Sequence, residues 1–579
     1  MKKLLSRLAA VAFMGMVIIL ASCSSDDDDA KPKPVVTPTS TSLTLIQDTT
    51  GTFDAGISAA AGIKDITVTI DKATLGTVEI TNTTDLVGKT VGTANFKFTS
   101  TFTLGTGTIT ITVTDNASQV STATIALTVT DHPPIEIAGL LGTSGTKEYQ
   151  ITAPTTWGPH LTYHVTSNVF VQATGSLTIL EGTTVIVDGK YSFTVRGNFY
   201  AYGTKTDSVV FTVPTTQRTK ANIFAGLWGG VLSSNTNGTA TYAAKEMVVQ
   251  YTRMEYTGML GQAWQDIVKL GELADTNTPG YALFFNNPDG TCVVQNSTFA
   301  YSTDVAVQVD QGHILISNNT FILNGKAGGE AINTKVGTFG DVAYNLFYKT
   351  ATNGVKFNAK GASSELHIYN NTAVECGWRQ TSHSDHGGSF NAEQGAKGML
   401  YNNLIVNCTR GVRFSNGKIA DVAHLSDGYN YHYISFAGPV GTGNTAFTPE
   451  FYPADGFIVL GNGKTGPAVD STFETAHDVP APVYTNKIYD PAATVAAAKD
   501  PMFVNFNAAA FTSALALQDE EPANENFPAA FDFHLKSGSP ALTGGKTNFS
   551  VYNTTALTAG GKTYASPAPS AYIGAFSTN

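Results

Sequence analysis

The sequence predicts an all-β chain in which a β-sandwich is followed by a parallel β-helix. Two observations predict this fold. An Asn followed by a short apolar strand returns roughly every 23 to 33 residues between Cys292 and Gly417. Upstream, from about Ser42 to Asp131, apolar and polar side chains alternate in short runs at the spacing of a sandwich. Repetition with this period marks a solenoid, and short strands separated by Gly and Asn predict stacked coils of β-structure.

The repeat has two strands that recur together. The Asn-marked strands are residues 295–299, 318–322, 344–347, 370–374 and 402–406. A second strand with alternating polar and apolar positions follows each of them, at residues 306–310, 331–333, 354–358, 388–391 and 411–415. Asn residues at the same place in successive coils are expected to form a ladder of side-chain hydrogen bonds at the strand spacing.

The coils extend upstream to about residue 140. Residues 248–251 recur as residues 293–296, about two coils later. Asp131-His132-Pro133-Pro134 marks the boundary with the sandwich, because paired prolines do not continue a strand. The sequence therefore predicts a sandwich at 41–131 and a β-helix at 132–579, with the less regular residues from about Phe447 onward as its C-terminal cover.

The N-terminus has the pattern of an export signal. Lys2, Lys3 and Arg7 precede an apolar stretch, residues 8–21, that is too short to span a bilayer. Residues 20–23, Leu-Ala-Ser-Cys, resemble the lipobox of bacterial lipoproteins, which implies that residues 1–22 are cleaved and that Cys23 carries several acyl chains. Residues 23–40 then form the lipidated Cys and a flexible tether.

The resemblance to a lipobox implies that the chain is a lipid-anchored protein of the outer membrane. Residues 24–29, Ser-Ser-Asp-Asp-Asp-Asp, resemble the acidic tag of lipoproteins exposed at the cell surface; the alternative is a solvated charge run. Charged residues make up 14% of the 579 residues, against about 25% in an average globular protein. The net charge of −11 argues against a nucleic-acid partner.

Three cysteines follow the lipidated Cys23 in the body of the mature chain, Cys292, Cys376 and Cys408. An odd number without a CxxC pair excludes a disulfide framework and disfavours a zinc site. Cys376 and Cys408 follow two Asn-marked strands at equivalent positions, so we expect them to stack as small apolar residues in adjacent coils.

Two resemblances refine the fold. Residues 113–117 and 122–129 resemble the last two strands of bacterial immunoglobulin-like domains, which usually act as spacers. Residues 154–260, with Leu227-Trp228-Gly229-Gly230 among them, resemble a family of right-handed parallel β-helix surface lipoproteins, with distant similarity to pectate lyase-like β-helices. Residues 531–541 are similar to the closing segment of many secreted β-helix proteins that cleave or bind polysaccharide. A polysaccharide partner is what these resemblances imply.

Outward side chains of the second strands predict a binding surface. We expect rows that run along the coils. The first holds Gln308, Ala331, Lys356, Ser389 and Arg413; the second holds Asp310, Asn333, Asn358, Asn391 and Ser415; the third holds Lys335, Lys360 and Glu393. Rows of Asn and Lys about 4.8 Å apart suit sugar hydroxyls and uronate carboxylates. The alternative is an ordinary solvated face.

One coil is lengthened by a loop, residues 377–387. Its candidate site residues are Trp378, Arg379, His383, Asp385 and His386. Loops on a rigid scaffold carry function more often than the scaffold does. A Trp stacks on sugar rings, and the His-x-Asp-His spacing supplies either a base or metal ligands.

Residues 329–335, followed one coil later by 355–357, are similar to the chondroitinase B and alginate lyase family. The resemblance implies that Glu330 binds calcium, that Lys335 is the base and that Lys356 stands where the family has Arg. Two departures count against it. Gly328 replaces a second acidic ligand, and Lys356 lacks the two-pronged geometry of Arg.

The sequence therefore predicts a surface lipoprotein whose β-helix binds or processes polysaccharide along an outer groove. Two alternatives stay open: a non-catalytic adhesin or rigid scaffold, and a calcium-dependent lyase of uronic-acid polysaccharides. Whether the chain is an enzyme, either a polysaccharide lyase or a glycoside hydrolase, is undecided by the sequence.

Overall fold

The computed structural model divides the chain into two units, Met1–His132 and Pro133–Asn579. The described residues are 31–142, 145–236, 239, 241–243, 245–361, 363–379, 388–409, 411–414, 421, 424–433, 435, 457–459, 500–512 and 531–579. Cys23 and the acidic run lie outside them. Among the described residues, no helix has the length and apolar character that crossing a bilayer requires.

The N-terminal unit contains two four-stranded sheets, ordered β1-β3-β6-β5 and β2-β8-β7-β4. The strands are β1 (Val35–Pro38), β2 (Ser42–Ile46), β3 (Thr50–Ser58), β4 (Ile63–Ile70), β5 (Gly76–Ile80), β6 (Val91–Ser100), β7 (Gly105–Asp115) and β8 (Val120–Thr130). Alternate apolar residues of both sheets, such as Phe96, Ile111 and Ile125, share one core. The immunoglobulin-like assignment of this unit stays a prediction.

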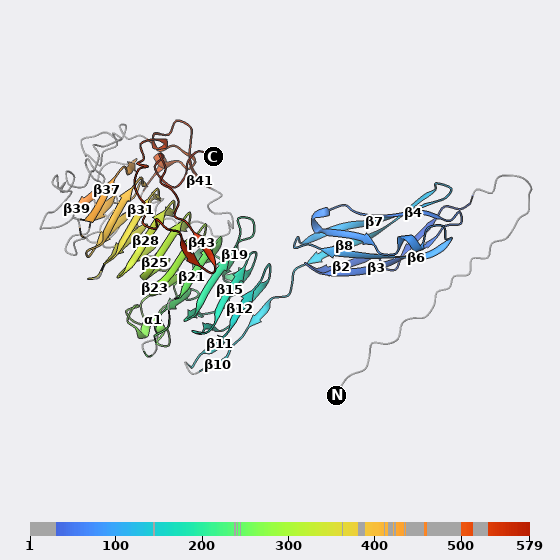
Figure 1. The fold of residues 1–579 in the computed structure, drawn as a ribbon, viewed down its shortest axis with the longest axis horizontal. Coiled ribbons are helices and arrows are strands. Elements are labelled where there is room, and N and C mark those ends of the chain that lie inside the picture. Colours follow the sequence, from blue (N-terminus) through green and yellow to red (C-terminus); the bar gives the residue numbers. More distant parts are fainter. Residues whose placement is uncertain are drawn as a thin grey trace, which may run out of the picture. The chain divides into compact units, whose positions relative to one another are not determined.

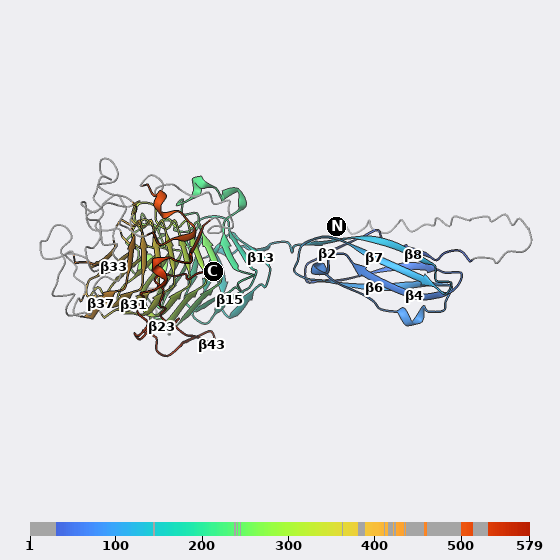
Figure 2. The same ribbon diagram turned by 90° about the horizontal axis from the view of Figure 1, so that it is seen from above.

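The second unit is a parallel β-helix with three walls (Figures 1 and 2). The first wall consists of β11 (Lys147–Ile151), β14 (Asn168–Val171), β17 (Phe193–Val195), β20 (Val231–Ser234), the first parts of β23 (Leu283–Gln295) and β25 (Val307–Ser317), β27 (Ile332–Thr334), β30 (Val355–Asn358), β33 (Phe390–Glu393), β36 (Val412–Phe414) and β39 (Phe457–Val459). A short hairpin partner, β10 (Leu140–Leu141), pairs antiparallel with β11.

The second wall consists of β12 (Pro154–Trp157), β15 (Ser176–Leu180), β18 (Asn198–Tyr202), β21 (Glu246–Gln250), the last parts of β23 and β25, β28 (Thr338–Ala343), β31 (Glu365–Tyr369), β34 (Lys397–Tyr401) and β37 (Leu425–Gly428). Because β23 and β25 bend from the first wall into the second, these two walls form one 20-stranded sheet.

The third wall is a separate 11-stranded sheet. It consists of β9 (Ile135–Ile137), β13 (Thr162–Val165), β16 (Thr184–Val187), β19 (Val209–Thr212), β22 (Thr252–Glu255), β24 (Thr298–Ala300), β26 (Thr320–Ile322), β29 (Leu346–Tyr348), β32 (Thr372–Val374), β35 (Leu404–Val406) and β38 (Tyr431–Tyr433). Neighbouring strands of this wall pair in parallel from coil to coil. The predicted parallel β-helix is therefore confirmed.

The predicted Asn ladder lies at the corner between the second and third walls. Over 2.9 to 3.0 Å, Asn319 donates to Asn345, Asn345 to Asn371, Asn371 to Asn403 and Asn403 to Asn430. Each also donates to a backbone carbonyl of the coil below, as Asn345 does to Ile316. The residue before each ladder position turns the corner with a positive φ, 58° at Asn318 and 51° at Asn370.

Columns of apolar side chains fill the space between the walls. Phe299, Phe321 and Phe347 stack with ring centroids 5.3 Å apart at both steps. Cys376 and Cys408 are fully buried in adjacent coils, and the Cys376 backbone N–H donates to Sγ of Cys408. The expected stacking of these two cysteines is therefore confirmed.

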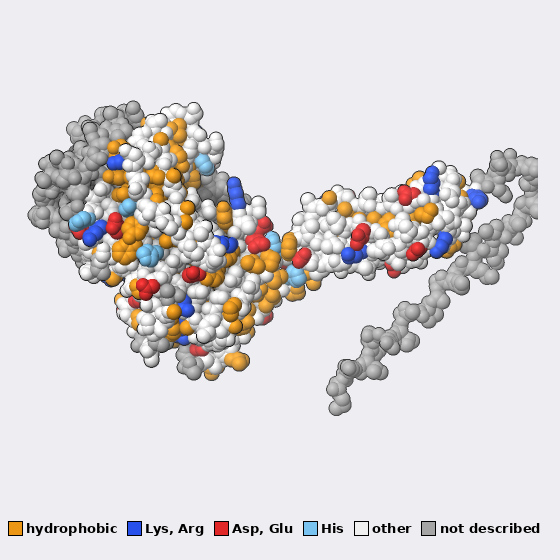
Figure 3. Space-filling view, viewed as in Figure 1, with side chains coloured by type: hydrophobic (Ala, Val, Ile, Leu, Met, Phe, Trp, Pro, Cys, Tyr) orange, Lys and Arg blue, Asp and Glu red, His pale blue; other side chains and the backbone are white. Residues whose placement is uncertain are grey.

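The described C-terminal residues cover the side of the β-helix, where the sequence predicted a cover for its end. Tyr564 and Ala559, in the hairpin of β42 (Leu557–Ala559) and β43 (Lys562–Tyr564), pack on the second-wall residues Val248, Val293 and Leu315. This segment, red in Figure 1, crosses the outside of that wall. Figure 3 shows the same side, where charged groups are scattered among uncharged ones.

A second stretch of the C-terminal region packs against the third wall. β40 (Phe503–Asn505) and β41 (Asp532–Leu535) form an antiparallel pair. Phe506 and Phe533 contact the ring of Tyr348 in β29 at centroid distances of 6.0 and 5.7 Å. Apolar side chains, and not unpaired strand edges, are what these C-terminal residues cover.

An insertion between β22 and β23 lies over the early part of the first wall. It contains the one-turn helix α1 (Asp266–Lys269), and its residues Ile267, Leu273 and Tyr281 pack on Leu232 and Phe284 of the wall. The insertion also corrects the sequence-based coil count. Val248 pairs directly with Val293, so the two similar segments lie in adjacent coils and not two coils apart.

Candidate functional site

The first wall becomes polar where the insertion ends. Its outward row runs through Phe170, Thr194, Leu232 and Phe284 in the early coils, and then through Gln308, Asn333, Lys356 and Asn391. Lys356 and Asn391 therefore lie on one wall, as expected. We call Gln308, Asn333 and Asn391 the amide row.

The register within this row differs from the predicted one. Asn333 pairs with Gln308 and Lys356, so it belongs to the row that was assigned to Ala331. Asn391 likewise replaces Ser389. Ala331 and Ser389 precede the strands and are fully buried. The predicted placement of Asn333 and Asn391 in a different row from Lys356 is therefore wrong, because the three residues share one row, whereas Asn358 lies in the next row with Glu393.

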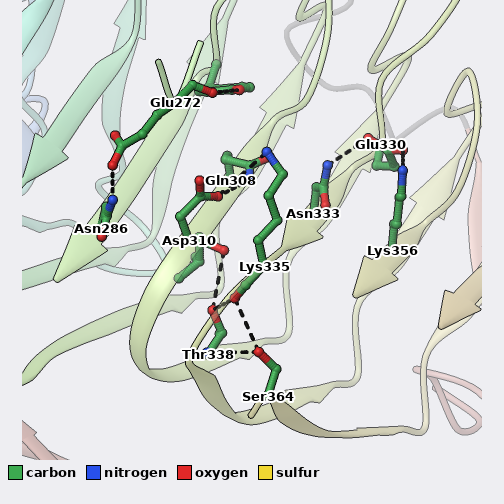
Figure 4. A network of polar contacts seen from close by, with 12 residues as sticks. Glu272, Asn286, Gln308, Asp310, Glu330, Asn333, Lys335, Thr338, Lys356 and Ser364 are labelled. Atoms are coloured by element: carbon green, nitrogen blue, oxygen red, sulfur yellow. Dashed lines mark hydrogen bonds and ion pairs between the residues drawn. The ribbon is translucent and has the colours of Figure 1, made fainter. Parts of the chain in front are cut away.

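Each member of the amide row donates its NH₂ group to a carboxylate. Figure 4 shows the pairs of Gln308 and Asn333. Gln308 donates to Asp310, two residues later in β25. Asn333 donates to Oε2 of Glu330 over 3.3 Å, and Asn391 donates to Oε1 of Glu393 over 2.7 Å. Because an ionised carboxylate only accepts hydrogen bonds, it fixes which end of each amide it faces.

The carbonyl ends of these amides are left without a protein donor. Oε1 of Gln308, Oδ1 of Asn333 and Oδ1 of Asn391 are buried and accept no hydrogen bond from the described part of the chain. Asn358 pairs with Glu393 in the strand register, and its Oδ1 is also buried without a hydrogen-bond donor in the described part of the chain. A buried acceptor without a donor costs about 1–3 kcal/mol, so a column of them marks a place that a donor-rich ligand would stabilise.

Two lysines lie among these carboxylates. The Lys356 ammonium is 3.7 Å from Oε1 of Glu330 and 3.8 Å from Oε2 of Glu393, so it bridges the coils on either side of its own. Lys335 Nζ is 3.9 Å from Oδ1 of Asp310. The positive charges expected to neutralise uronates are therefore already compensated within the protein.

Two further carboxyl groups beside the row were missed by the sequence reasoning. Burial raises the pKa of Glu272 to about 8, with the charge of Asp310 adding to the effect. Burial raises the pKa of Asp304 to about 7, and the charge of Glu330 raises it further. Glu272 comes from the insertion and its carboxylate accepts a hydrogen bond from Asn286. The length of the chain between β22 and β23 was the one signal that pointed to it.

The loop residues behave differently from the prediction. Trp378 is buried, donates from Nε1 to the Asn407 carbonyl over 2.7 Å and contacts the Phe511 ring at 4.9 Å. It is therefore packed inside the protein, and the expectation that it stacks on a sugar is wrong. The Arg379 guanidinium lies over the Phe224 ring at 5.0 Å. His383, Asp385 and His386 lie outside the described residues.

The metal and lyase assignments stay predictions. Glu330, the expected calcium ligand, faces Lys356 and Asn333. Within the described ranges no three His, Cys, Asp or Glu side chains are grouped so as to hold a metal ion. Lys335 and Lys356 come from adjacent coils, as the resemblance implies. Lys360 lies at an exposed turn after β30, and Ser415 is not among the described residues. Arg413 pairs with Asn391 through its backbone.

Comparisons with known proteins add little. No protein-family model matches the chain, and no curated protein sequence matches it. Among solved structures, a family 28 exopolygalacturonase from Yersinia enterocolitica aligns at 8% identity over 76% of this chain and 100% of its own, with a TM-score of 0.19. The periplasmic alginate epimerase AlgG aligns at 11% identity over 70% of this chain and 91% of its own, with a TM-score of 0.19.

Domains 4 and 5 of the S-layer protein SbsC align at 18% identity over 17% of this chain, with a TM-score of 0.14; the chain spans about half, 53%, of that structure. It spans 14% of a larger SbsC fragment, domains 1–6, at a TM-score of 0.15. TM-scores this low show neither the fold nor the function of either unit. The strand pairing shows the β-helix, and the contacts between its residues define the candidate site.

Proposed function

We propose that the first wall binds a hydroxyl-rich polysaccharide along the amide row. The observation that carries the proposal is the repeated amide–carboxylate pair, which turns the acceptor oxygens of Gln308, Asn333 and Asn391 away from their carboxylates. Successive coils lie about 4.8 Å apart, close to the length of one sugar unit in an extended chain. Sugar hydroxyls are donors that match such a column.

The charges favour a neutral glycan over a polyuronate. Lys356 is compensated by Glu330 and Glu393, and Lys335 by Asp310. A uronate carboxylate brought beside Lys335 and Lys356 would also meet the carboxylates of Asp310, Glu330 and Glu393. It would offer acceptors where the amide row already presents acceptors. The sequence-based expectation of uronate binding at this wall is therefore replaced by one of hydroxyl recognition.

Affinity electrophoresis of the mature chain tests the proposal, with gels containing neutral polysaccharides, such as xylan, glucan and mannan, or polyuronates. We expect retardation on at least one neutral polysaccharide, and at least a tenfold weaker affinity in Asn333→Ala and Asn391→Ala, equivalent to about 1.4 kcal/mol or more. Asn548→Ala, at an exposed position of the C-terminal segment, is the matched control. Equal mobility on every gel, with or without polysaccharide, would refute the proposal and leave the scaffold alternative.

Hydrolysis of the bound glycan is a second candidate function, favoured by one observation. A carboxyl group that is protonated near neutral pH is what a general acid requires, and burial gives Glu272 this property. Release of reducing sugar by the native chain and its loss in Glu272→Gln would establish hydrolysis. The lyase alternative is tested separately, by the ultraviolet absorbance of an unsaturated product from polyuronates with calcium and by its loss in Lys335→Ala.

We also propose that the chain is a lipid-anchored protein of the outer membrane, exposed at the cell surface. The support is the pattern of residues 2–23, in which a basic and an apolar stretch precede Leu-Ala-Ser-Cys. Metabolic labelling with a palmitate analogue is expected to mark the native chain and not Cys23→Ala. Protease treatment of intact cells then tests surface exposure. An unlabelled native chain would contradict anchoring without bearing on the glycan proposal.

A further inference from the structure

An insertion covers the outward side chains that precede the amide row. It consists of residues 256–282, between β22 and β23, where the next coil needs only residues 301–306 between β24 and β25. Apolar side chains of the insertion pack directly on Leu232 and Phe284, which are 3% and 0% exposed. These two residues occupy the row positions immediately before Gln308. The row is therefore covered up to the coil in which the amides begin.

Polar contacts extend this cover along the same coil. Glu272 of the insertion accepts a hydrogen bond from Asn286, which lies two residues after Phe284 in β23 (Figure 4). The Tyr281 ring stacks on the Phe284 ring at a centroid distance of 5.5 Å, and the Tyr281 hydroxyl donates to the Glu272 carbonyl over 3.2 Å. The strand β23 pairs directly with β25, which contains Gln308. An extended ligand lying on the row therefore meets the insertion as soon as it passes Gln308.

An ion pair fastens the insertion to the wall. Nε and Nη2 of Arg196, which follows β17, donate to the two carboxylate oxygens of Asp266 in α1 over 2.8 and 3.0 Å. Asp266 is 4% exposed, so the pair is largely shielded from water. A two-pronged contact of this kind fixes the orientation of both side chains. We therefore expect the insertion to stay in place when a ligand binds.

We infer that the first wall binds the terminal units of a polysaccharide chain and not a stretch of its interior. The inference rests on the proposed function of the amide row. A linear glycan that follows the row from Asn333 to Gln308 meets the insertion next, so the glycan must end there. From Gln308 to Asn391 the row crosses four coils about 4.8 Å apart, which matches about four sugar units.

Titration calorimetry of the mature chain tests this inference. The probes are linear xylo-, gluco- and manno-oligosaccharides and soluble linear fractions of xylan, glucan and mannan. One bound protein per glycan chain is expected whatever the length of the glycan. The molar affinity is expected to rise up to about four sugar units and then to stay constant. Binding to interior segments would instead raise the number of bound proteins in proportion to the length of the glycan.

Hexasaccharides that carry a bulky aromatic label at one end or at the other identify the end that meets the insertion. One of the two labels is expected to weaken the affinity at least tenfold, because it collides with the insertion. The other label projects beyond the opposite end of the four-coil row and is expected to leave the affinity within threefold of that of the unlabelled hexasaccharide.

A variant that lacks residues 262–277 is expected to bind interior segments as well. The Gly261 backbone N–H donates to the Thr278 carbonyl over 3.0 Å, and Leu260 and Pro279 form an antiparallel bridge, so joining Gly261 to Thr278 closes a short turn. We expect several copies of this variant to bind one polymer chain. Lys269→Gln, at an exposed position of α1, is the matched control and is expected to keep one bound protein per chain.

The inference is overturned if the number of bound native proteins rises with the length of the glycan, or if neither label weakens the affinity. Both results would leave glycan binding by the amide row intact. If no oligosaccharide or polymer binds, the proposed function fails and the inference fails with it. The native chain supplies all of these results, so they do not depend on whether the deletion variant folds.

Discussion

The side-chain amide of Asn391 donates a hydrogen bond of 2.7 Å to Glu393, two residues further along β33. Side chains two residues apart on a strand point to the same face, so the carboxylate is in place to hold the amide in one orientation. Gln308 and Asp310 repeat this spacing in β25, whereas Asn333 reaches back to Glu330. The same local device recurs in the coils that form the polar part of the first wall.

Replacing Glu393 by Gln tests this device. A glutamine side chain both donates and accepts, so the Asn391 amide loses its fixed orientation, and Lys356 loses its ion pair with Glu393. We expect about a tenfold loss of affinity for the neutral polysaccharide that the native chain retains, about 1.4 kcal/mol, in affinity electrophoresis. Glu365→Gln, on the second wall, is the control. An unchanged affinity in Glu393→Gln would show that the carboxylate does not position the amide.

Stability is expected to fall as the pH rises from about 4.5 to about 8. The folded state raises the pKa of Glu272 from 4.5 to about 8 and that of Asp304 from 3.8 to about 7, mainly through burial. Between the two values the folded chain binds more protons than the unfolded chain, so the contribution of these groups is complete at low pH and is lost through their folded pKa values.

Unfolding temperatures recorded across this pH range check the prediction. Glu272→Gln and Asp304→Asn remove the ionisation and are expected to flatten the decline. Asp289→Asn, at an exposed position of β23, is expected to keep the native slope. A decline that is as steep in both test variants as in the native chain would contradict the assignment of the slope to these carboxyl groups.

Much of the β-helix was predictable because its signals are local. The Asn ladder and the period of the coils follow directly from the repeat at Asn319, Asn345 and Asn371. The register of the site was not predictable in the same way. A slip of two residues, from Asn333 to Ala331, keeps every side chain on the same face, so the alternating pattern identifies the face and leaves the row undetermined.

Long-range packing explains the remaining differences. Nothing in the sequence around Trp378 shows that Phe511, from the C-terminal region, covers it. Glu272 reaches the first wall only because the insertion folds back onto Leu232 and Phe284. Both features depend on segments that are distant in the chain and have no repeat, so the periodic pattern contains no information about where they lie.

Trp378 therefore distinguishes packing from sugar stacking. Trp378→Ala is expected to destabilise the β-helix by about 3–5 kcal/mol, since it removes a buried aromatic side chain and its hydrogen bond to Asn407. Trp378→Phe is expected to lose less stability and to bind polysaccharide like the native chain. A folded Trp378→Phe protein with strongly reduced affinity in affinity electrophoresis would restore the sequence-based assignment.

The Asn ladder supplies a stability prediction. Asn345 donates to Asn371 and to the Ile316 carbonyl, and it accepts from Asn319. Asn345→Ala leaves buried partners on both sides without their hydrogen bonds, and each such group costs about 1–3 kcal/mol. We expect a markedly lower urea midpoint. Asn277→Ala, at an exposed loop position, is expected to unfold like the native chain; equal midpoints for both variants would contradict a structural role of the ladder.

Asp341 attaches the C-terminal segment to the second wall. Its fully buried carboxylate accepts hydrogen bonds from the backbone of Tyr552 and Asn553, both 2.8 Å, and from Ser566 Oγ at 2.6 Å. Hydrogen bonds to a charged group contribute about 1.5–3 kcal/mol each, so Asp341→Ala is expected to release the segment before the β-helix unfolds.

Limited proteolysis followed by mass spectrometry measures this release. Cleavage between residues 545 and 579 is expected to be at least tenfold faster in Asp341→Ala, whereas Asp289→Ala, an exposed carboxylate removed elsewhere, is expected to be cut at the native rate. Release would expose Val248, Val293 and Leu315, which the hairpin of β42 and β43 covers, so binding of a hydrophobic dye should rise in parallel. Faster cleavage without that rise would mean that the segment frays at its end while the hairpin stays in place.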